Sequence, residues 1–411
     1  MTKTIPVGGS QSLRRQALAK LRPWLDAPVV KVLTGVRRCG KSVLLQQLRD
    51  DLVAGGVPDD HVILINFESL ANEPLTNYPA LYRHLMERIT DDGRWHVFLD
   101  EVQLVDQWER VVNSLRVDAN CDIVVTGSNA WLLSSDLATL LTGRYVEFGV
   151  YPFSFAEHLQ LVGDGAGPNT EAAFRSYLDR GGMPGTHEVG DDDAALTYLR
   201  DVSNSILLKD VVARKRLRDI DLLQRLLVFV MDNLGRPFSA NSVGAFLKNQ
   251  RRSLGAETVY NYLAALSDAH LIYKAERFDV KGKRVLETQE KYYLADHGFA
   301  HAWLGRRPDE TPGVLENIVY LELRRRGFEV RIGKQGDREI DFVANRTGER
   351  IYIQVCTQMV DQATVDRELA PLAAIEDNHR KLVLSLDQAS PSNRDGIERR
   401  YLPGFLLDDT W

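Results

Sequence analysis

A glycine-framed octapeptide, GVRRCGKS at residues 35–42, limits the possible fold of this chain more than any other feature. It follows a short apolar run and precedes a stretch in which apolar residues recur at helical spacing. Glycines at both ends let the backbone curl so that successive N–H groups point at one anion, with a helix N-terminus behind them. The pattern therefore predicts a phosphate-binding P-loop between a buried strand and a helix, in an α/β fold.

The chemistry of the octapeptide assigns a role to its last two residues. Lys41 is placed to neutralise the β- and γ-phosphates of a nucleotide, and the Ser42 hydroxyl is a magnesium ligand. Arg37 and Arg38 contact either phosphate or a partner. The residues expected to surround the nucleotide are Gly35, Val36, Arg37, Arg38, Cys39, Gly40, Lys41, Ser42 and Val43.

A second motif is an apolar stretch that ends in two carboxylates, Asp100 and Glu101. We expect Asp100 to hold Mg²⁺, directly or through water. Glu101 would orient or deprotonate the water that attacks the γ-phosphate. Together the two motifs predict an ATPase with ATP and Mg²⁺ as cofactors.

Two further positions are candidates for the same site. Ser128 or Asn129, after the next predicted strand, would hydrogen-bond the γ-phosphate or the attacking water. Arg144 precedes the fifth strand, where its cation would reach the nucleotide of a neighbouring subunit as an arginine finger does. The competing interpretations are a plain turn and a structural surface arginine.

Short apolar runs alternate with helical patterns over the first 150 residues, which indicates βαβ units and a parallel sheet. The predicted helices are 41–52 and 108–115. The predicted strands are 29–35, 61–67, 95–100, 121–128 and 144–150.

Composition limits the class of protein. With 411 residues, roughly two to four domains are expected. No apolar run is long enough to cross a bilayer and the N-terminus has no apolar signal region, so we expect a cytoplasmic protein with no membrane partner. Three scattered cysteines suit a reducing compartment.

The middle of the chain reads as a winged helix. Residues 238–250 and 256–270 have helical patterns, and two strand-like runs flank a basic turn at 281–283. Net charge is −6 overall, but residues 206–290 carry 15 Lys+Arg against 10 Asp+Glu. We expect sequence-tolerant DNA binding, with a protein–protein module as the alternative. The cations expected to meet DNA phosphates are Arg251, Arg252, Lys281, Lys283 and Arg284.

Several motifs carry a resemblance to a known family. GVRRCGKS, FLDEVQ, VVTGSNAWLL, LTGRYVEF followed by YPFSFAEH, GGMPG and ILLKDVV resemble those of prokaryotic AAA-type (AAA+) ATPases with a C-terminal domain of unknown function. The resemblance runs over nearly the whole chain. It implies a P-loop sheet of strand order 5-1-4-3-2, a winged helix and a restriction-endonuclease-like C-terminal domain. It also implies a homo-oligomeric ring, with a hexamer as one form.

The last hundred residues have a helix, three strands, a helix and a strand, which resembles the PD-(D/E)xK nuclease core. Glu316 and Asp341 fill two of its acidic positions. The third position reads Gln354-Val355-Cys356, which offers neither the acid nor the lysine that the chemistry needs. We therefore expect a catalytically degenerate domain without nuclease activity.

The resulting prediction is an α/β chain with an AAA-type core (1–155), a helical lid and connector (156–235), a winged helix (236–300) and the nuclease-like domain (301–411). Its expected function is magnesium-dependent ATP hydrolysis coupled to remodelling of DNA or to translocation along it, with branched and single-stranded DNA as the candidate substrates. The alternative is a nucleotide-gated switch or scaffold that acts on proteins. The sequence does not specify the pathway or the number of subunits.

Overall fold

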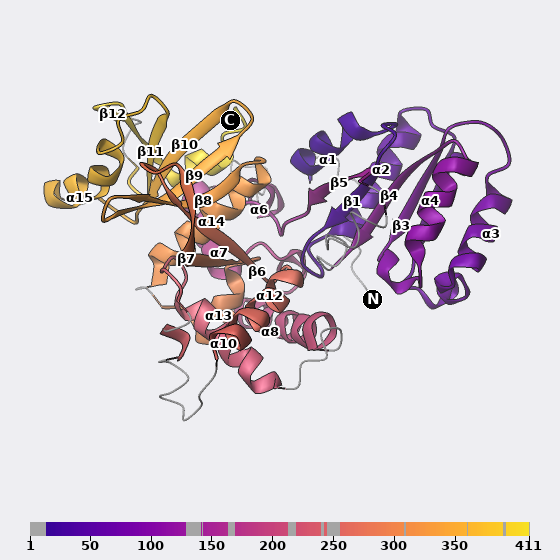
Figure 1. Cartoon of the computed structure of the whole chain (residues 1–411), viewed down its shortest axis with the longest axis horizontal. Coiled ribbons are helices and arrows are strands. Elements are labelled where there is room, and N and C mark those ends of the chain that lie inside the picture. The colour runs from indigo at the N-terminus through magenta and orange to yellow at the C-terminus, as the bar shows by residue number, and fades with distance from the viewer. Residues whose placement is uncertain are drawn as a thin grey trace. The chain divides into compact units, whose positions relative to one another are not determined.

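The structure is a computed structural model that describes residues 14–128, 141, 143–162, 169–212, 219–239, 242–244, 255–307, 310–359, 361–388 and 392–410. The chain divides into two compact units, with the boundary between Tyr151 and Pro152. Figure 1 shows the elements of both units in chain order. No described helix has the length and apolar character that a membrane crossing requires.

The first unit is built on a five-stranded parallel sheet with strand order β2-β3-β4-β1-β5 (Figure 1). All five predicted strands are confirmed, and the strand order is the one that the family resemblance implied. The strands are β1 (Val30–Thr34), β2 (Val62–Asn66), β3 (Trp95–Asp100), β4 (Cys121–Gly127) and β5 (Tyr145–Gly149).

Helices cover this sheet. Among its described residues the α-helices are α1 (Arg15–Leu21), α2 (Lys41–Ala54), α3 (Tyr78–Arg88) and α4 (Trp108–Asp118). Alternate side chains of β1 to β4 pack with α3 and α4 in one buried apolar cluster, as the period of two in a strand requires. Short 3-10 turns complete the unit at Arg22–Trp24, Asp59–His61, Leu70–Thr76 and Val102–Leu104.

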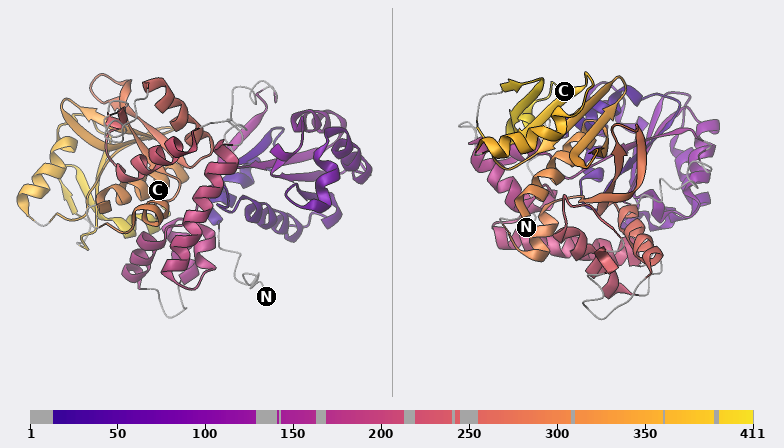
Figure 2. Two further views of the ribbon diagram at one scale, coloured as in Figure 1. Left: turned by 90° about the horizontal axis from the view of Figure 1, so that it is seen from below. Right: turned by 60° about the vertical axis from the view of Figure 1, so that its left-hand side comes forward.

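The second unit opens with helices. They are α6 (Phe155–Val162), α7 (Thr170–Arg180), α8 (Asp192–Ser205), the π-helix Ile206–Val212, α10 (Ile220–Asp232), α12 (Ala256–Asp268) and α13 (Gly298–Leu304), with a 3-10 turn at Pro184–His187. The helices α7, α8 and α10, in the pink shades of Figure 2, gather around α13. The apolar face of α12, which includes Val259 and Leu263, is buried, while Tyr260 and Asn261 are exposed.

The second unit also contains an eight-stranded sheet of order β12-β13-β11-β10-β9-β8-β6-β7. Its members are β6 (Ile272–Asp279), β7 (Arg284–Leu294), β8 (Glu329–Gln335), β9 (Arg338–Arg346), β10 (Glu349–Val355), β11 (Arg380–Ser385), β12 (Ser392–Arg394) and β13 (Ile397–Tyr401). It packs with α14 (Thr311–Arg325), α15 (Gln362–Ala373) and α16 (Leu402–Leu407). The predicted helix, three strands, helix and strand are all present.

The predicted two-strand ribbon is the antiparallel hairpin β6–β7. Strand β6 also pairs in parallel with β8, so the ribbon and the C-terminal strands form one sheet. The predicted lid, winged helix and nuclease-like domain all fall within the second unit. Their description as separate domains of those types remains a prediction.

Candidate functional site

The octapeptide forms a tight loop between β1 and α2. Gly35 has φ 151° and Gly40 has φ 103°, so both lie in backbone regions that favour glycine. A Cβ atom on Gly35 would lie 2.0 Å from the carbonyl oxygen of Val150, and one on Gly40 would lie 2.8 Å from Nη2 of Arg14. Arg38 lies between them at φ 65°. Gly35 is therefore required by close approach as well as by backbone angle, and Gly40 by its backbone angle.

Lys41 begins α2 and is only 3% exposed. Its Nζ donates to the carbonyl oxygens of Gly35 (3.1 Å) and Val36 (3.3 Å) and lies 3.7 Å from Oε1 of Glu101. These oxygens give the ammonium group the negative partners that phosphate oxygens would supply. The lysine is thus held over the loop, facing the second motif.

Asp100 ends β3 beside its neighbours in the sheet. Its Oδ2 accepts from Nδ2 of Asn66 at 2.7 Å, and its Oδ1 accepts from the Thr126 hydroxyl at 2.5 Å. The side chain of Ser42 also hydrogen-bonds to Asp100. Burial raises the pKa of Asp100, although the hydrogen bonds from Thr126 and Ser42 favour its ionised form. The two predicted magnesium ligands are therefore in direct contact.

Glu101 adopts a left-handed conformation, with φ 55°. Such angles are costly for a non-glycine residue and persist where the surrounding structure enforces them. Its backbone N–H donates to the Thr126 hydroxyl at 2.9 Å, and its carboxylate accepts from the amide of Gln103. One hydroxyl, that of Thr126, therefore connects both acids of the motif.

Ser128 follows β4 at the same edge, because Gly127 pairs with Thr34, the residue before the P-loop. The Ser128 side chain is fully buried, and its Oγ has no hydrogen-bond partner among the described residues. An unpartnered buried hydroxyl at this edge can bind a ligand oxygen or water. Asn129, the other candidate, lies outside the described residues.

The other predicted nucleotide-binding residues of the loop differ in burial and in their partners. Arg37 pairs with Glu68 at 3.0 Å, while Arg38 is exposed. Val36 and Cys39 are fully buried, and the Cys39 thiol donates to the carbonyl of Val150. Burial raises the pKa of this thiol. Among the predicted loop residues, Val43 exposes about half of its side chain (51%), an apolar surface beside the loop.

Three residues of the site went unassigned in the sequence. Arg14 donates to the carbonyl oxygens of Tyr151, at 2.7 Å, and Cys39, which braces the loop from beneath. No local pattern marks Arg14, because its partners lie far along the chain. Asn66 and Thr126 end strands on either side of β3, so the strand order would have indicated both.

The side chains at this edge suit a magnesium–nucleotide complex. Mg²⁺ prefers oxygen ligands and keeps several waters, and Ser42 and Asp100 present a hydroxyl and a carboxylate side by side. The unpartnered Ser128 hydroxyl adds a donor at the same edge.

Comparison with known proteins agrees with this geometry. The family model of an AAA domain matches residues 28–159, and that of a domain of unknown function (DUF8612) matches residues 171–310. An uncharacterized protein of Haemophilus influenzae is 35% identical over 96% of this chain and 98% of its own length. The chain belongs to the AAA-type P-loop ATPases.

Two further similar proteins give no additional information on function. The uncharacterized protein MJ1544 of Methanocaldococcus jannaschii is 30% identical to this ATPase over 83% of the chain and 77% of its own length. Cdc6p of Pyrobaculum aerophilum covers 78% of the ATPase and 96% of its own chain, at 12% identity and a TM-score of 0.30. A superposition this loose supports no functional inference.

Arg144 of the ATPase is exposed. It lies at the edge of the sheet formed by the amino ends of the strands, whereas the P-loop lies at the edge formed by their carboxyl ends. The carbonyl of Arg144 accepts from the backbone N–H of Val30, where β1 begins. A five-residue strand separates the two edges by roughly 16 Å. Arg144 therefore cannot reach the nucleotide of its own subunit.

The structure describes three of the five cationic residues that were predicted to contact DNA. Lys281, Lys283 and Arg284 lie at the β6–β7 turn and are exposed, with Arg284 in loose contact with Asp279 at 3.9 Å. Arg251 and Arg252 lie outside the described residues.

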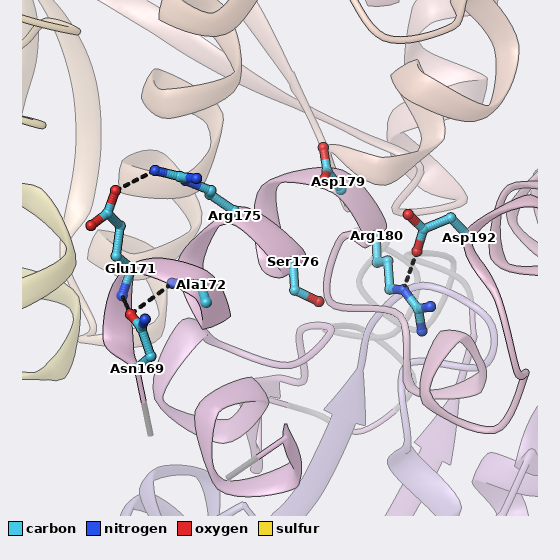
Figure 3. A pocket seen from close by; sticks show the side chains of 8 residues that line it. All are labelled: Asn169, Glu171, Ala172, Arg175, Ser176, Asp179, Arg180 and Asp192. Atoms are coloured by element: carbon cyan, nitrogen blue, oxygen red, sulfur yellow. Dashed lines mark hydrogen bonds and ion pairs between the residues drawn. The ribbon is translucent and has the colours of Figure 1, made fainter. Parts of the chain in front are cut away.

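A hollow of about 450 Å³ on α7 is a second candidate ligand site (Figure 3). Two of its cations are already paired, Arg175 with Glu171 and Arg180 with Asp192. Exposed ion pairs of this kind are common on helix surfaces. We assign no ligand to this hollow.

Proposed function

We propose that this ATPase binds ATP with magnesium at the carboxyl edge of its parallel sheet and hydrolyses it there. The observation that carries the proposal is the convergence of the two motifs: Lys41 Nζ lies 3.7 Å from Glu101 Oε1, and Ser42 bonds to Asp100. Separate loops bring these four side chains together only when the sheet is assembled.

Each residue has a distinct task in the proposed reaction. The P-loop amides and Lys41 bind the phosphates and neutralise the charge that develops on transfer. Magnesium, held by Ser42 and Asp100, would withdraw electron density from the phosphate oxygens. Glu101 orients the attacking water and accepts its proton, and Ser128 hydrogen-bonds the γ-phosphate or that water.

We further propose that the protein works as a homo-oligomer that acts on DNA. The position of Arg144 supports a role in trans, because the residue is exposed and lies too far from its own P-loop. The exposed cations Lys281, Lys283 and Arg284 on one hairpin turn support contacts with DNA phosphates. The alternative is a nucleotide-gated switch on protein partners.

The test of hydrolysis is a comparison of ATP turnover with nucleotide binding in Glu101→Gln. Removal of a positioned general base lowers turnover by about 100-fold or more, while nucleotide affinity stays within about 3-fold. Glu87→Gln, on the exposed surface of α3, is the matched control and should leave both unchanged. Turnover at the wild-type rate in Glu101→Gln would refute this role.

The same assay separates the two proposed roles. Turnover is measured without DNA and with duplex, branched and single-stranded DNA. Stimulation that weakens with salt and is lost in Lys281→Ala/Lys283→Ala/Arg284→Ala favours DNA remodelling. Slow turnover that ignores every DNA favours the switch.

A further inference from the structure

A buried ion cluster lies in the second unit. Lys291 on β7 meets Glu316 on α14 and two acids of β9, Glu339 and Asp341. Its Nζ lies 3.1 Å from Oε2 of Glu316, 2.8 Å from Oε1 of Glu339 and 3.8 Å from Oδ1 of Asp341. One ammonium group therefore faces three carboxylates.

The cluster is largely shielded from solvent, and Glu339, whose side chain is 28% exposed, lies at its margin. The Lys291 side chain is 1% exposed, and those of Glu316 and Asp341 are about 10% exposed. Burial alone would lower the pKa of Lys291, but the three carboxylates outweigh it and raise the pKa above its ordinary value. Burial raises the pKa of Glu316 and Asp341. The charged ammonium group of Lys291 is thus the positive partner of these acids.

A nuclease-like core would hold a divalent metal at Glu316 and Asp341, and the residues present do not fit one. The oxygen that Glu316 turns toward Lys291 also accepts from the Tyr293 hydroxyl at 3.0 Å. The second oxygen of Asp341 accepts from the backbone N–H of Val355 at 2.8 Å. One oxygen of each carboxylate is already hydrogen-bonded to a protein group, and the ammonium group lies between the two side chains.

The position that the nuclease pattern reserves for a further acid is also neutral. The Gln354 side chain accepts from the backbone N–H of Asp341 at 3.4 Å and donates to Glu368 at 3.5 Å. Cys356 is buried, and its pKa is raised to about 12 by burial. Neither side chain adds a negative oxygen for a cation.

We infer that the Lys291 ammonium is a built-in substitute for the divalent cation of this core. It pairs with Glu316, Glu339 and Asp341 and ties α14 and the β6–β7 hairpin to β9. The cluster is a structural ion site that is complete without metal. The inference does not depend on the proposed ATPase function, because it concerns side chains of the second unit alone.

The experiment measures the melting temperature of the full chain with and without about 1 mM Mn²⁺. All variants carry Asp100→Asn, so that the P-loop edge does not contribute cation binding. Lys291→Met removes the charge at similar volume, and Lys274→Met, a half-exposed lysine of the same hairpin, is the matched control. Lys291→Met/Asp341→Asn tests whether the effect needs the acids.

The parent is the chain that carries Asp100→Asn alone. We expect Mn²⁺ to shift the melting temperatures of this parent and of Lys274→Met by less than about 1 °C. Lys291→Met should melt at least about 5 °C lower, and Mn²⁺ should restore most of that loss by occupying the vacated position. The double variant should respond less. Lys291→Arg keeps the charge and should stay folded and insensitive to Mn²⁺.

Three outcomes would overturn the inference. The first is stoichiometric Mn²⁺ binding by the parent at micromolar concentration, with cleavage of plasmid DNA that is lost in Asp341→Ala. The second is a Lys291→Met protein as stable as the parent and insensitive to Mn²⁺. The third is a Lys291→Met protein that fails to fold even when Mn²⁺ is present.

Discussion

At the scale of single residues, the site depends on hydroxyl and amide groups that hold the two acids. The sequence predicted Asp100 and Glu101 because adjacent carboxylates after a buried strand have a specific use behind a P-loop. It did not predict Thr126, because a threonine in a strand is ordinary and its role appears only when β4 lies beside β3. The same holds for Asn66 on the other side.

Replacement of Thr126 by valine should lower turnover about 10-fold and raise the Mg²⁺ concentration needed for half-maximal rate. The change keeps the volume but removes the hydroxyl that donates to Asp100 and accepts from the backbone of Glu101. Steady-state rates over a magnesium series check this. Thr126→Ser should recover most of the activity, and a serine variant no better than valine would argue against a positioning role for the hydroxyl.

At the scale of elements, local patterns predicted the first unit well. Its five strands agree with the predicted bounds within one or two residues, because each is a continuous apolar run ended by polar residues. The helix α3 was missed, although its capping Asn77 and the proline at its second position are both typical of a helix start. The pairing of β6 with β8 joins segments about 55 residues apart, and no local pattern encodes such a contact. For the same reason the sequence did not predict the contact between Lys291 and Asp341.

At the scale of the whole molecule, each unit has its own polar interior. In the second unit four imidazoles and Tyr177 form a chain of ring contacts. His158 and His297 contact Tyr177, His187 contacts His158, and His301 contacts His297. Both nitrogens of His158 lack a hydrogen-bond partner among the described residues. Burial lowers the pKa of His158 to about 3 and those of His187, His297 and His301 to about 4. These rings are neutral in the folded protein at neutral pH.

The second unit should therefore lose stability as the pH falls from about 6.5 to about 4. Below about pH 6.5 these four histidines bind protons in the unfolded chain but stay unprotonated in the folded protein. The free energy of unfolding therefore falls with acidification. Asp296, whose pKa burial raises to about 7, and Glu316 and Asp341, whose pKa values burial also raises, act in the opposite sense but are three groups against four. Urea unfolding at about pH 7 and pH 5 should show a loss on the order of a few kcal/mol.

A single replacement checks the source of this dependence. His158→Phe keeps an aromatic ring in the same packing and should reduce the pH slope by about one proton in four. His84→Phe, at a half-exposed position of the first unit, should leave the slope unchanged. An unchanged slope in His158→Phe would mean that other groups titrate.

The most direct test of the account is equilibrium binding of labelled ATP to the purified, folded chain in the presence of magnesium. The account predicts one nucleotide per chain and a loss of affinity of at least about 10-fold in Lys41→Ala, because that ammonium group lies over the loop where phosphates bind. Binding should also weaken when magnesium is removed. A folded wild-type chain that takes up no nucleotide with magnesium present would contradict the central claim.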